Sequence, residues 1–236
     1  MKRSQESYLL ESPGGDLLET AEDVFGRVLR TDWIQPGFVI VVLPRDTESH
    51  ELRQTMVSLK QELSRLFELR WGEPLQYLSL GRFDQQASTK LHLDGGPERS
   101  LLMLGYEPTE VASELLIADY TACARRLGIS PAAFMVDHNP MFQAAESVLE
   151  DDILRINDWA EDRCRIVVIN NSCVPENHPR FTAGVLHGAH ILKPDPTKRR
   201  VINSTMLVPG AQDEERTAGS VHEFLTTDAI SGAITL

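Results

Sequence analysis

Residues 1–70 combine helix-type and strand-type hydrophobic patterns. Apolar residues recur at helical spacing over 16–30, which predicts an amphipathic helix packed on one side of a larger structure. The segment GFVIVVLP, 37–44, is a short β-branched run closed by proline, and it predicts a strand buried on both faces. Residues 46–70 predict the longest helix, because Asp46 can cap its N-terminus and one apolar stripe continues along it. The chain therefore begins with an N-terminal helical region.

Beyond residue 70 the pattern changes to short extended segments separated by Gly, Asp, Gln and Pro. The segments expected to be strands are LQYLSLGRF (75–83), TKLHLDG (89–95), RSLLMLGYE (99–107), SELLIADY (113–120), CRIVVINNS (164–172), AGVLHGA (183–189), RRVINSTMLV (199–208) and GAITL (232–236). Their spacing predicts an antiparallel sandwich or barrel with a helical insertion at about 121–163. Residues 113–128 could instead form a single helix. We expect residues 1–236 to form one domain of the α+β class, mainly β with flanking helices.

Composition and charge narrow the class of protein. Of the 236 residues, 42% are hydrophobic and 25% are charged, as in a globular domain with a buried core. The formal net charge of −12 would repel nucleic acid and anionic membranes, so neither is expected as a partner. The three cysteines have no CxxC spacing, and no apolar run approaches a membrane span, so we expect an unexported cytoplasmic protein. The sequence contains neither GxGxxG nor a P-loop, which argues against a doubly wound nucleotide-binding fold.

The segment KLHLDGG contains the first candidate for chemistry. If it is extended, His92 and Asp94 lie on one face and the leucines beside them lie on the other. Gly95 and Gly96 then allow the chain to turn without a side chain beside the pair. The pair is either part of a metal site or the solvated face of a strand end.

A second candidate lies almost a hundred residues later, in AGVLHGAHILKPDPTKRRVINSTMLV. His187 on a strand would complete a set of two histidines and one carboxylate, which leaves the opposite positions of an iron ion open. His190 would face the other way from His187, so only one of the two can be the ligand, and the strand context favours His187. Arg200 could bind the far carboxylate of a 2-oxo acid, although the adjacent Arg199 competes for this role.

The order HxD, later His-Gly and then Arg resembles the Fe(II)/2-oxoglutarate-dependent dioxygenases over about Phe38 to Val208. The resemblance implies a double-stranded β-helix (a jelly-roll, cupin-like core), with Fe(II) as the metal and 2-oxoglutarate and O2 as cosubstrates. It also implies that His92, Asp94 and His187 bind iron and that Arg200 binds the C5 carboxylate of 2-oxoglutarate. The family's frequent Arg-x-Ser pair is absent, and Ser204 could supply a helping hydroxyl from the same face as Arg200. The expected reaction hydroxylates an unidentified small-molecule or protein substrate and releases succinate and CO2.

Two other readings use the same residues. A jelly-roll protein could bind a metal or a ligand without catalysis, since a fold does not fix a function. A zinc-dependent hydrolase could use the same three ligands with a bound water. Arg200 separates these readings from the oxygenase, because neither requires a carboxylate anchor. Tyr77, Ser79 and Arg82, on a neighbouring expected strand, are further candidates for contact with a substrate.

Overall fold

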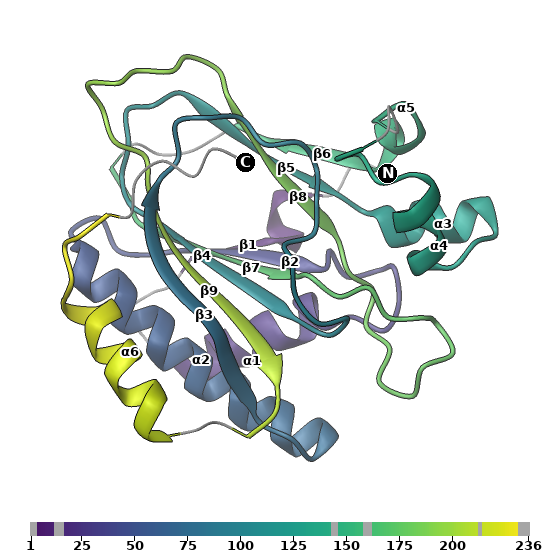
Figure 1. Cartoon of the computed structure of the whole chain (residues 1–236), viewed down its shortest axis with the longest axis horizontal. Helices are drawn as coiled ribbons and strands as arrows, with labels where there is room; N and C mark the ends of the chain where they lie inside the picture. Colours follow the sequence, from purple (N-terminus) through teal and green to yellow (C-terminus); the bar gives the residue numbers. More distant parts are fainter. Residues whose placement is uncertain (1–3, 12–16, 143–145, 158–161, 212–213, 231–236) are drawn as a thin grey trace.

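The computed structural model describes residues 4–11, 17–142, 146–157, 162–211 and 214–230, and it contains two β-sheets with helices packed on them (Figure 1). The larger sheet has the order β1-β2-β7-β4-β9-β3, and all its neighbouring strands are antiparallel except β1 and β2. Its strands are β1 (Leu9–Glu11), β2 (Phe38–Val42), β3 (Leu75–Asp84), β4 (Leu101–Tyr106), β7 (Arg165–Asn170) and β9 (Val201–Pro209). The smaller sheet is antiparallel with the order β6-β5-β8, formed by β5 (Ser113–Ala118), β6 (Ile153–Ile156) and β8 (Leu186–Ile191).

The helices form two groups on opposite sides of the paired sheets (Figure 1). The first group packs on the larger sheet and contains α1 (Leu17–Val28), α2 (Ser49–Trp71) and α6 (Glu214–Thr226). The second group lies beside the smaller sheet and contains α3 (Tyr120–Leu127), α4 (Pro131–Asp137) and α5 (Glu146–Leu149). Short 3-10 turns occur at Gln5–Ser7 and Glu150–Asp152. Every helix within the described ranges is too short or too polar to cross a bilayer.

Strand β2 shows how the hydrophobic cores divide. Val39 and Val41 belong to the core under the helices, whereas Phe38, Ile40 and Val42 belong to the core between the two sheets. All five side chains are buried, which confirms the expectation of a strand covered on both faces. The structure is thus mixed α and β with a large, mostly antiparallel sheet, and it is compatible with a jelly-roll-like fold.

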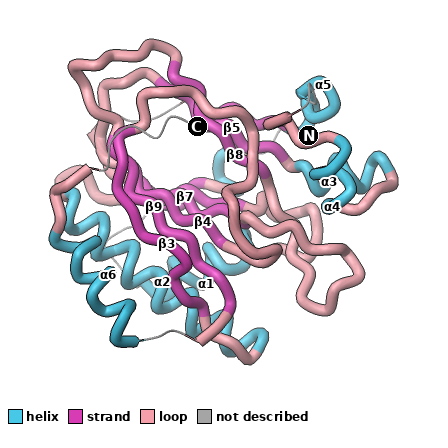
Figure 2. The backbone as a smooth tube through the Cα atoms, in the orientation of Figure 1, coloured by secondary structure: helices cyan, strands magenta, loops and turns pink. Residues whose placement is uncertain are grey.

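The expected strand over 89–95 is wrong, although this segment lies against β8. The Thr89 amide donates to the Ala189 carbonyl at 2.8 Å, and the His92 amide donates to the His187 carbonyl at 2.9 Å. The step from Thr89 to His92 is one residue longer than the opposing step on β8, so the extra residue breaks the regular ladder. Only an isolated bridge between His92 and His187 remains. Figure 2 shows the surrounding loop as it leaves β3, crosses to the smaller sheet and returns to β4.

Three further expectations need correction. The long helix is capped by Glu48 rather than Asp46, because Glu48 forms a reciprocal capping box with Glu51. The alternative of a single helix over 113–128 is wrong, because the expected strand forms as β5 and the next residue, Asp119, caps α3 by accepting from the Ala122 amide at 3.1 Å. The expected helical insertion also contains strand β6, which pairs with β5.

At the C-terminal end, the acidic segment 211–220 has too few apolar residues to indicate a helix from its sequence, yet α6 begins within it and contributes the buried Phe224 to the core. The expected strand at 232–236 lies outside the described residues.

Candidate metal centre

The candidate metal centre forms where residues 89–95, called the bulged segment below because of the extra residue between Thr89 and His92, lie against β8. The backbone amides of His92 and His187 donate to each other's carbonyls, at 2.9 and 3.0 Å, and their ring centroids lie 4.4 Å apart. Asp94 follows two residues after His92, and its carboxylate approaches both rings. Residues from distant parts of the sequence therefore form one His-Asp-His group, whose ligand atoms all lie within 4.8 Å of one another.

The distances are those of a group that can hold one ion. Oδ1 of Asp94 is 3.1 Å from Nε2 of His92 and 3.8 Å from Nε2 of His187. Ligands that bind one metal at about 2.1 Å lie about 3 to 3.5 Å from each other, so only small shifts are needed. His92 also donates from Nδ1 to the Lys90 carbonyl at 2.7 Å, which orients the ring and leaves Nε2 facing Asp94.

Without an ion, the three groups shift one another's protonation. Burial acts to lower the pKa of His92, but the hydrogen bonds to Asp94 and to the Lys90 carbonyl outweigh it and raise this pKa. Burial acts to raise the pKa of Asp94, and the two histidines outweigh it, so this pKa is lowered. Burial, helped by repulsion from His92, lowers the pKa of His187 to about 4. A neutral His187 beside an ionised Asp94 is the state in which both can bind a metal.

Asn171 holds Asp94 in place through the backbone. Its Oδ1 accepts from the Asp94 amide at 2.9 Å, and its Nδ2 donates to the Asp94 carbonyl at 3.1 Å and to the Ser100 hydroxyl at 2.9 Å. Asn171 is only 3% exposed, so these bonds are shielded from water. The sequence analysis missed this residue, because its position just after a hydrophobic strand does not show where its side chain points.

Gly188, directly after His187, allows the bulged segment to lie close to β8. A β-carbon at Gly188 would lie 3.1 Å from the carbonyl oxygens of Thr89 and Lys90 and 3.2 Å from the Leu91 amide. These neighbours are backbone atoms, so they cannot move aside as a flexible side chain can. The glycine in the His-Gly pair therefore has a packing role.

A cavity of about 220 Å³ opens from this group between the two sheets. It is lined by Phe83, Gln85, Thr89, His92, Asp94, Leu104, Tyr106, His187, Gly188, Ala189, Ile202 and Ser204. Most of this wall is apolar or uncharged, so Asp94 is the main anionic group in it. Ser204 of β9 lies in the wall, where the sequence analysis expected a helping hydroxyl.

Arg200 lies behind this cavity wall. It is 1% exposed, its Nε donates to the Ser113 hydroxyl at 3.0 Å, and its Nη1 donates to the side-chain oxygen of Gln85. The Tyr106 ring lies over the guanidinium, 5.0 Å from Cζ to the ring centroid. Among the described residues no carboxylate forms an ion pair with Arg200, so its charge has only neutral partners. Its neighbour Arg199 is exposed.

The other candidates lie elsewhere. His190 is exposed on β8 and pairs with Glu114 at 3.2 Å, so the structure brings His187 rather than His190 to His92 and Asp94. Tyr77 packs on the helix side of the larger sheet, under Lys60. Arg82 forms an ion pair with Glu107 at 3.0 Å. Tyr77, Ser79 and Arg82 are absent from the cavity wall, and Phe83 of the same strand contributes to it instead.

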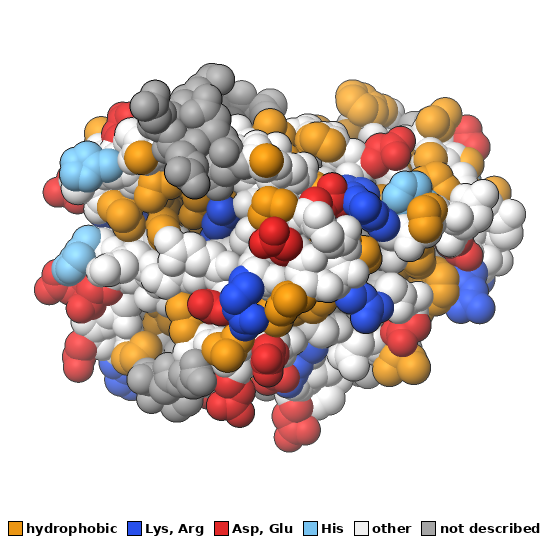
Figure 3. Space-filling model, turned by 90° about the horizontal axis from the view of Figure 1, so that it is seen from below, with side chains coloured by type: hydrophobic (Ala, Val, Ile, Leu, Met, Phe, Trp, Pro, Cys, Tyr) orange, Lys and Arg blue, Asp and Glu red, His pale blue; other side chains and the backbone are white. Residues whose placement is uncertain are grey.

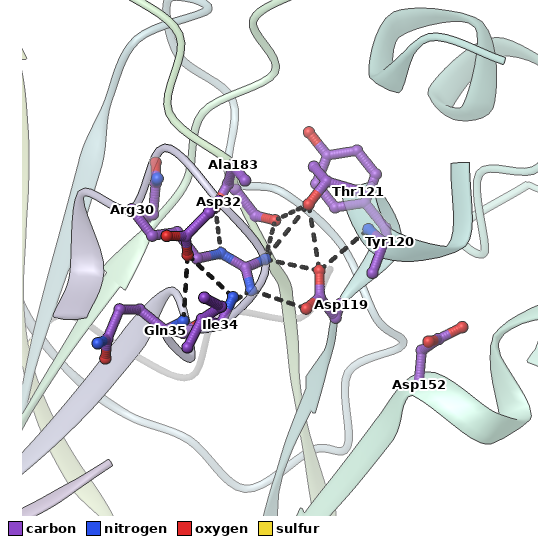
Figure 4. A network of polar contacts seen from close by, with 12 residues as sticks. Arg30, Asp32, Ile34, Gln35, Asp119, Tyr120, Thr121, Asp152 and Ala183 are labelled. Carbon is purple, nitrogen blue, oxygen red and sulfur yellow. Dashed lines mark hydrogen bonds and ion pairs between the residues drawn. The ribbon is translucent and has the colours of Figure 1, made fainter. Parts of the chain in front are cut away.

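A second buried arginine holds the segment that leads into β8 (Figure 4). Arg30 binds Asp119 through two hydrogen bonds of 2.8 and 2.6 Å, and its Nε donates to the Ala183 carbonyl at 3.0 Å. Thr121 adds a hydroxyl to the same network. This network ties Arg30, in the segment that follows α1, to the start of α3 and to the segment that precedes His187. The sequence analysis missed it.

Comparison with known proteins does not establish a family. No protein-family model matches the chain, and no curated protein matches it. Two solved structures of the iron and alpha-ketoglutarate-dependent endoperoxidase NvfI align with 79% of this chain at 14% identity. One, a variant form, has a TM-score of 0.38 with 83% of its chain covered; the other, in a different conformation, has 0.39 with 80% covered. Similarity this low does not establish a shared fold, so the function must be argued from the residues of this chain.

Proposed function

We propose that this protein is an Fe(II)/2-oxoglutarate-dependent oxygenase with a double-stranded β-helix core. One observation carries the proposal: a His-Asp-His group lines a cavity, and directly behind the wall of this cavity lies a buried arginine, Arg200, with no carboxylate partner among the described residues. A metal and an organic dianion are the ligands that would satisfy these two features together.

The donor set fits Fe(II). His92, Asp94 and His187 supply two imidazoles and one carboxylate, which is the set of non-haem iron oxygenases with open positions for other ligands. All three come from the wall of the cavity, so the remaining positions would face its interior. Nδ1 of His187 is buried and has no hydrogen-bond partner in the described part of the chain.

Arg200 would bind the C5 carboxylate of 2-oxoglutarate. A planar guanidinium can bind a carboxylate through two parallel hydrogen bonds, and burial strengthens the interaction. Ser204 in the cavity wall could donate a further hydrogen bond to the same ligand. The distal carboxylate would then hold the molecule with its 2-oxo acid end toward His92, Asp94 and His187.

Fe(II) with 2-oxoglutarate and O2 supplies the oxidising chemistry, which yields succinate and CO2 and most often hydroxylates a C–H bond of the substrate. The chain contributes position and exclusion of water: Asn171 and Lys90 orient two of the ligands, and Phe83, Leu104 and Ile202 keep the cavity apolar. The substrate, a small molecule or a protein, is unidentified. The net charge of −12 disfavours nucleic acid and anionic membranes as partners.

The test is to add 2-oxoglutarate to the anaerobic protein loaded with Fe(II). We expect a weak visible metal-to-ligand band, and succinate when air is admitted. Asp94→Ala should lose the band, whereas His190→Ala is the matched control and should keep it, since His190 lies outside the cavity wall. Absence of both band and succinate with excess iron would overturn the oxygenase and leave a zinc hydrolase or a non-catalytic binding protein.

A further inference from the structure

Gln85 lies between Arg200 and the cavity. Arg200 is absent from the cavity wall, whereas Gln85 and Tyr106, which both contact its guanidinium, form part of that wall. A carboxylate that enters the cavity therefore meets the Gln85 amide before it meets the arginine.

The contact between Gln85 and Arg200 is of a kind that a carboxylate can replace. The side-chain oxygen of Gln85 is a neutral acceptor for Nη1, whereas a carboxylate adds the attraction between opposite charges and can bind the guanidinium through two parallel hydrogen bonds. Ser113 binds Nε at 3.0 Å and can stay in place during the exchange. The backbone N–H of Gln85 donates to the backbone carbonyl of Arg200 at 3.0 Å. The backbone can therefore stay fixed, and only the Gln85 side chain has to move.

We propose that the Gln85 side chain is a displaceable cover of Arg200, which satisfies the guanidinium in the ligand-free protein and gives way to a ligand carboxylate. Its identification with the C5 carboxylate of 2-oxoglutarate rests on the proposed function. The cover makes Gln85 a specificity-determining residue. A ligand with an amide or an ester at this end would only exchange one neutral acceptor for another, and it would gain little.

Substitutions of Gln85 should change ligand-free stability and carboxylate affinity in opposite directions. Gln85→Glu supplies a permanent carboxylate to Arg200, so the ligand-free protein should be no less stable and the Kd for 2-oxoglutarate should rise at least about a hundredfold. Gln85→Met removes the competing acceptor while it keeps the length of the side chain. The ligand-free protein should become less stable, and the Kd should fall about three- to tenfold.

The experiment combines urea unfolding with titration of 2-oxoglutarate, and separately of glutarate, in the presence of Mn(II). Gln86→Met is the matched control, because Gln86 bonds Asp84 and Lys198 rather than the Arg200 guanidinium. It should lower stability without tightening the binding of either carboxylate. The opposite signs for the two Gln85 variants would distinguish a cover from a residue that only supports the fold.

The possible results test two hypotheses separately: that Gln85 is a displaceable cover of Arg200, and that the protein is an oxygenase. A weaker Kd in Gln85→Met, an unchanged Kd in Gln85→Glu, or no carboxylate binding even in Gln85→Met would each overturn the cover. If both variants behave as expected but the wild type forms no succinate with iron and O2, the cover stands and the oxygenase function fails.

Discussion

Two arginines, Arg30 and Arg200, are equally buried, at 2% and 1% exposure, and differ in what surrounds their charge. Arg30 has a bidentate carboxylate partner in Asp119 and further carbonyl partners, all supplied by the chain. Arg200 has an amide, a hydroxyl and an aromatic ring, and no described carboxylate. A buried charge is costly unless it is paired, so the charge of Arg30 is compensated within the fold, whereas the charge of Arg200 has only neutral partners among the described residues. Burial alone therefore does not separate the two arginines, whereas the charge of their partners does; under the proposed function, a ligand carboxylate would supply the negative charge that Arg200 lacks.

The largest predicted loss of stability comes from breaking the Arg30–Asp119 ion pair. Asp119→Asn keeps an acceptor that can cap α3 but removes the negative charge beside Arg30, which leaves a buried cation. We expect the free energy of unfolding to fall by about 3 to 5 kcal/mol. Urea unfolding would measure it, with Asp23→Asn as the control, since the Arg27–Asp23 pair is exposed and should contribute less than about 1 kcal/mol. Equal losses in the two variants would mean that the Arg30 pair is not a structural tie.

Arg200→Met should give the converse result. Removal of a buried cation with no described carboxylate partner should change the free energy of unfolding by less than about 1.5 kcal/mol, because the loss of its hydrogen bonds to Gln85 and Ser113 and the relief of the buried charge offset each other. The Kd for 2-oxoglutarate should rise at least about a hundredfold, while metal affinity stays unchanged. Calorimetric titration with Mn(II) and then 2-oxoglutarate would separate the two. Arg199→Met is the control and should bind both normally, because Arg199 is exposed. A large loss of stability in Arg200→Met would place this arginine with Arg30.

Two neighbouring asparagines, Asn170 and Asn171, differ in the same way: one supports the fold and the other supports the candidate metal centre. Asn170 and Asn171 are adjacent and buried, but Asn170 bonds the Val28 carbonyl, whereas Asn171 bonds the backbone of Asp94. Replacement of either by alanine should lower the free energy of unfolding by about 1 to 3 kcal/mol. Only Asn171→Ala should also weaken Co(II) binding, by about 10- to 100-fold, because the carboxylate loses its support. Absorption of the bound Co(II) would report the change, and equal Co(II) affinities in the two variants would refute the positioning role.

The sequence indicated the parts of the molecule whose signal is local. The β-branched run GFVIVVLP, 37–44, predicts the strand observed as β2, and the alternation in KLHLDG places His92 and Asp94 on one face. The same alternation also predicted a strand that does not form. The bulge depends on Thr89 pairing with Ala189, a contact between segments that local patterns cannot align.

The supporting residues were missed for a related reason. Asn171 contacts Asp94, Gln85 contacts Arg200 and Arg30 contacts Asp119, and each pair is far apart in the sequence. A polar residue after a strand or helix has many possible roles, and only the tertiary structure selects one. Histidine and aspartate in HxD point to metal chemistry by their type, whereas an isolated Gln or Asn does not.

The smallest predicted effect concerns protonation of the metal-free centre. Burial lowers the pKa of His187 to about 4, whereas an unfolded histidine titrates near 6.5, so between these values the unfolded chain binds more protons. This group therefore destabilises the fold progressively as the pH falls from 6.5 toward 4. His92, whose pKa is raised, contributes in the opposite direction, but it gains this stability above the range, as the pH falls toward 6.5, and its contribution is constant at lower pH. Urea unfolding of the chelator-treated protein should show a smaller loss of stability on acidification in His187→Gln than in the wild type. His190→Gln should keep the wild-type slope, because His190 is exposed. Identical slopes in all three proteins would indicate that His187 is accessible to protons in the folded state, and the buried neutral ligand that the metal site requires would then be absent.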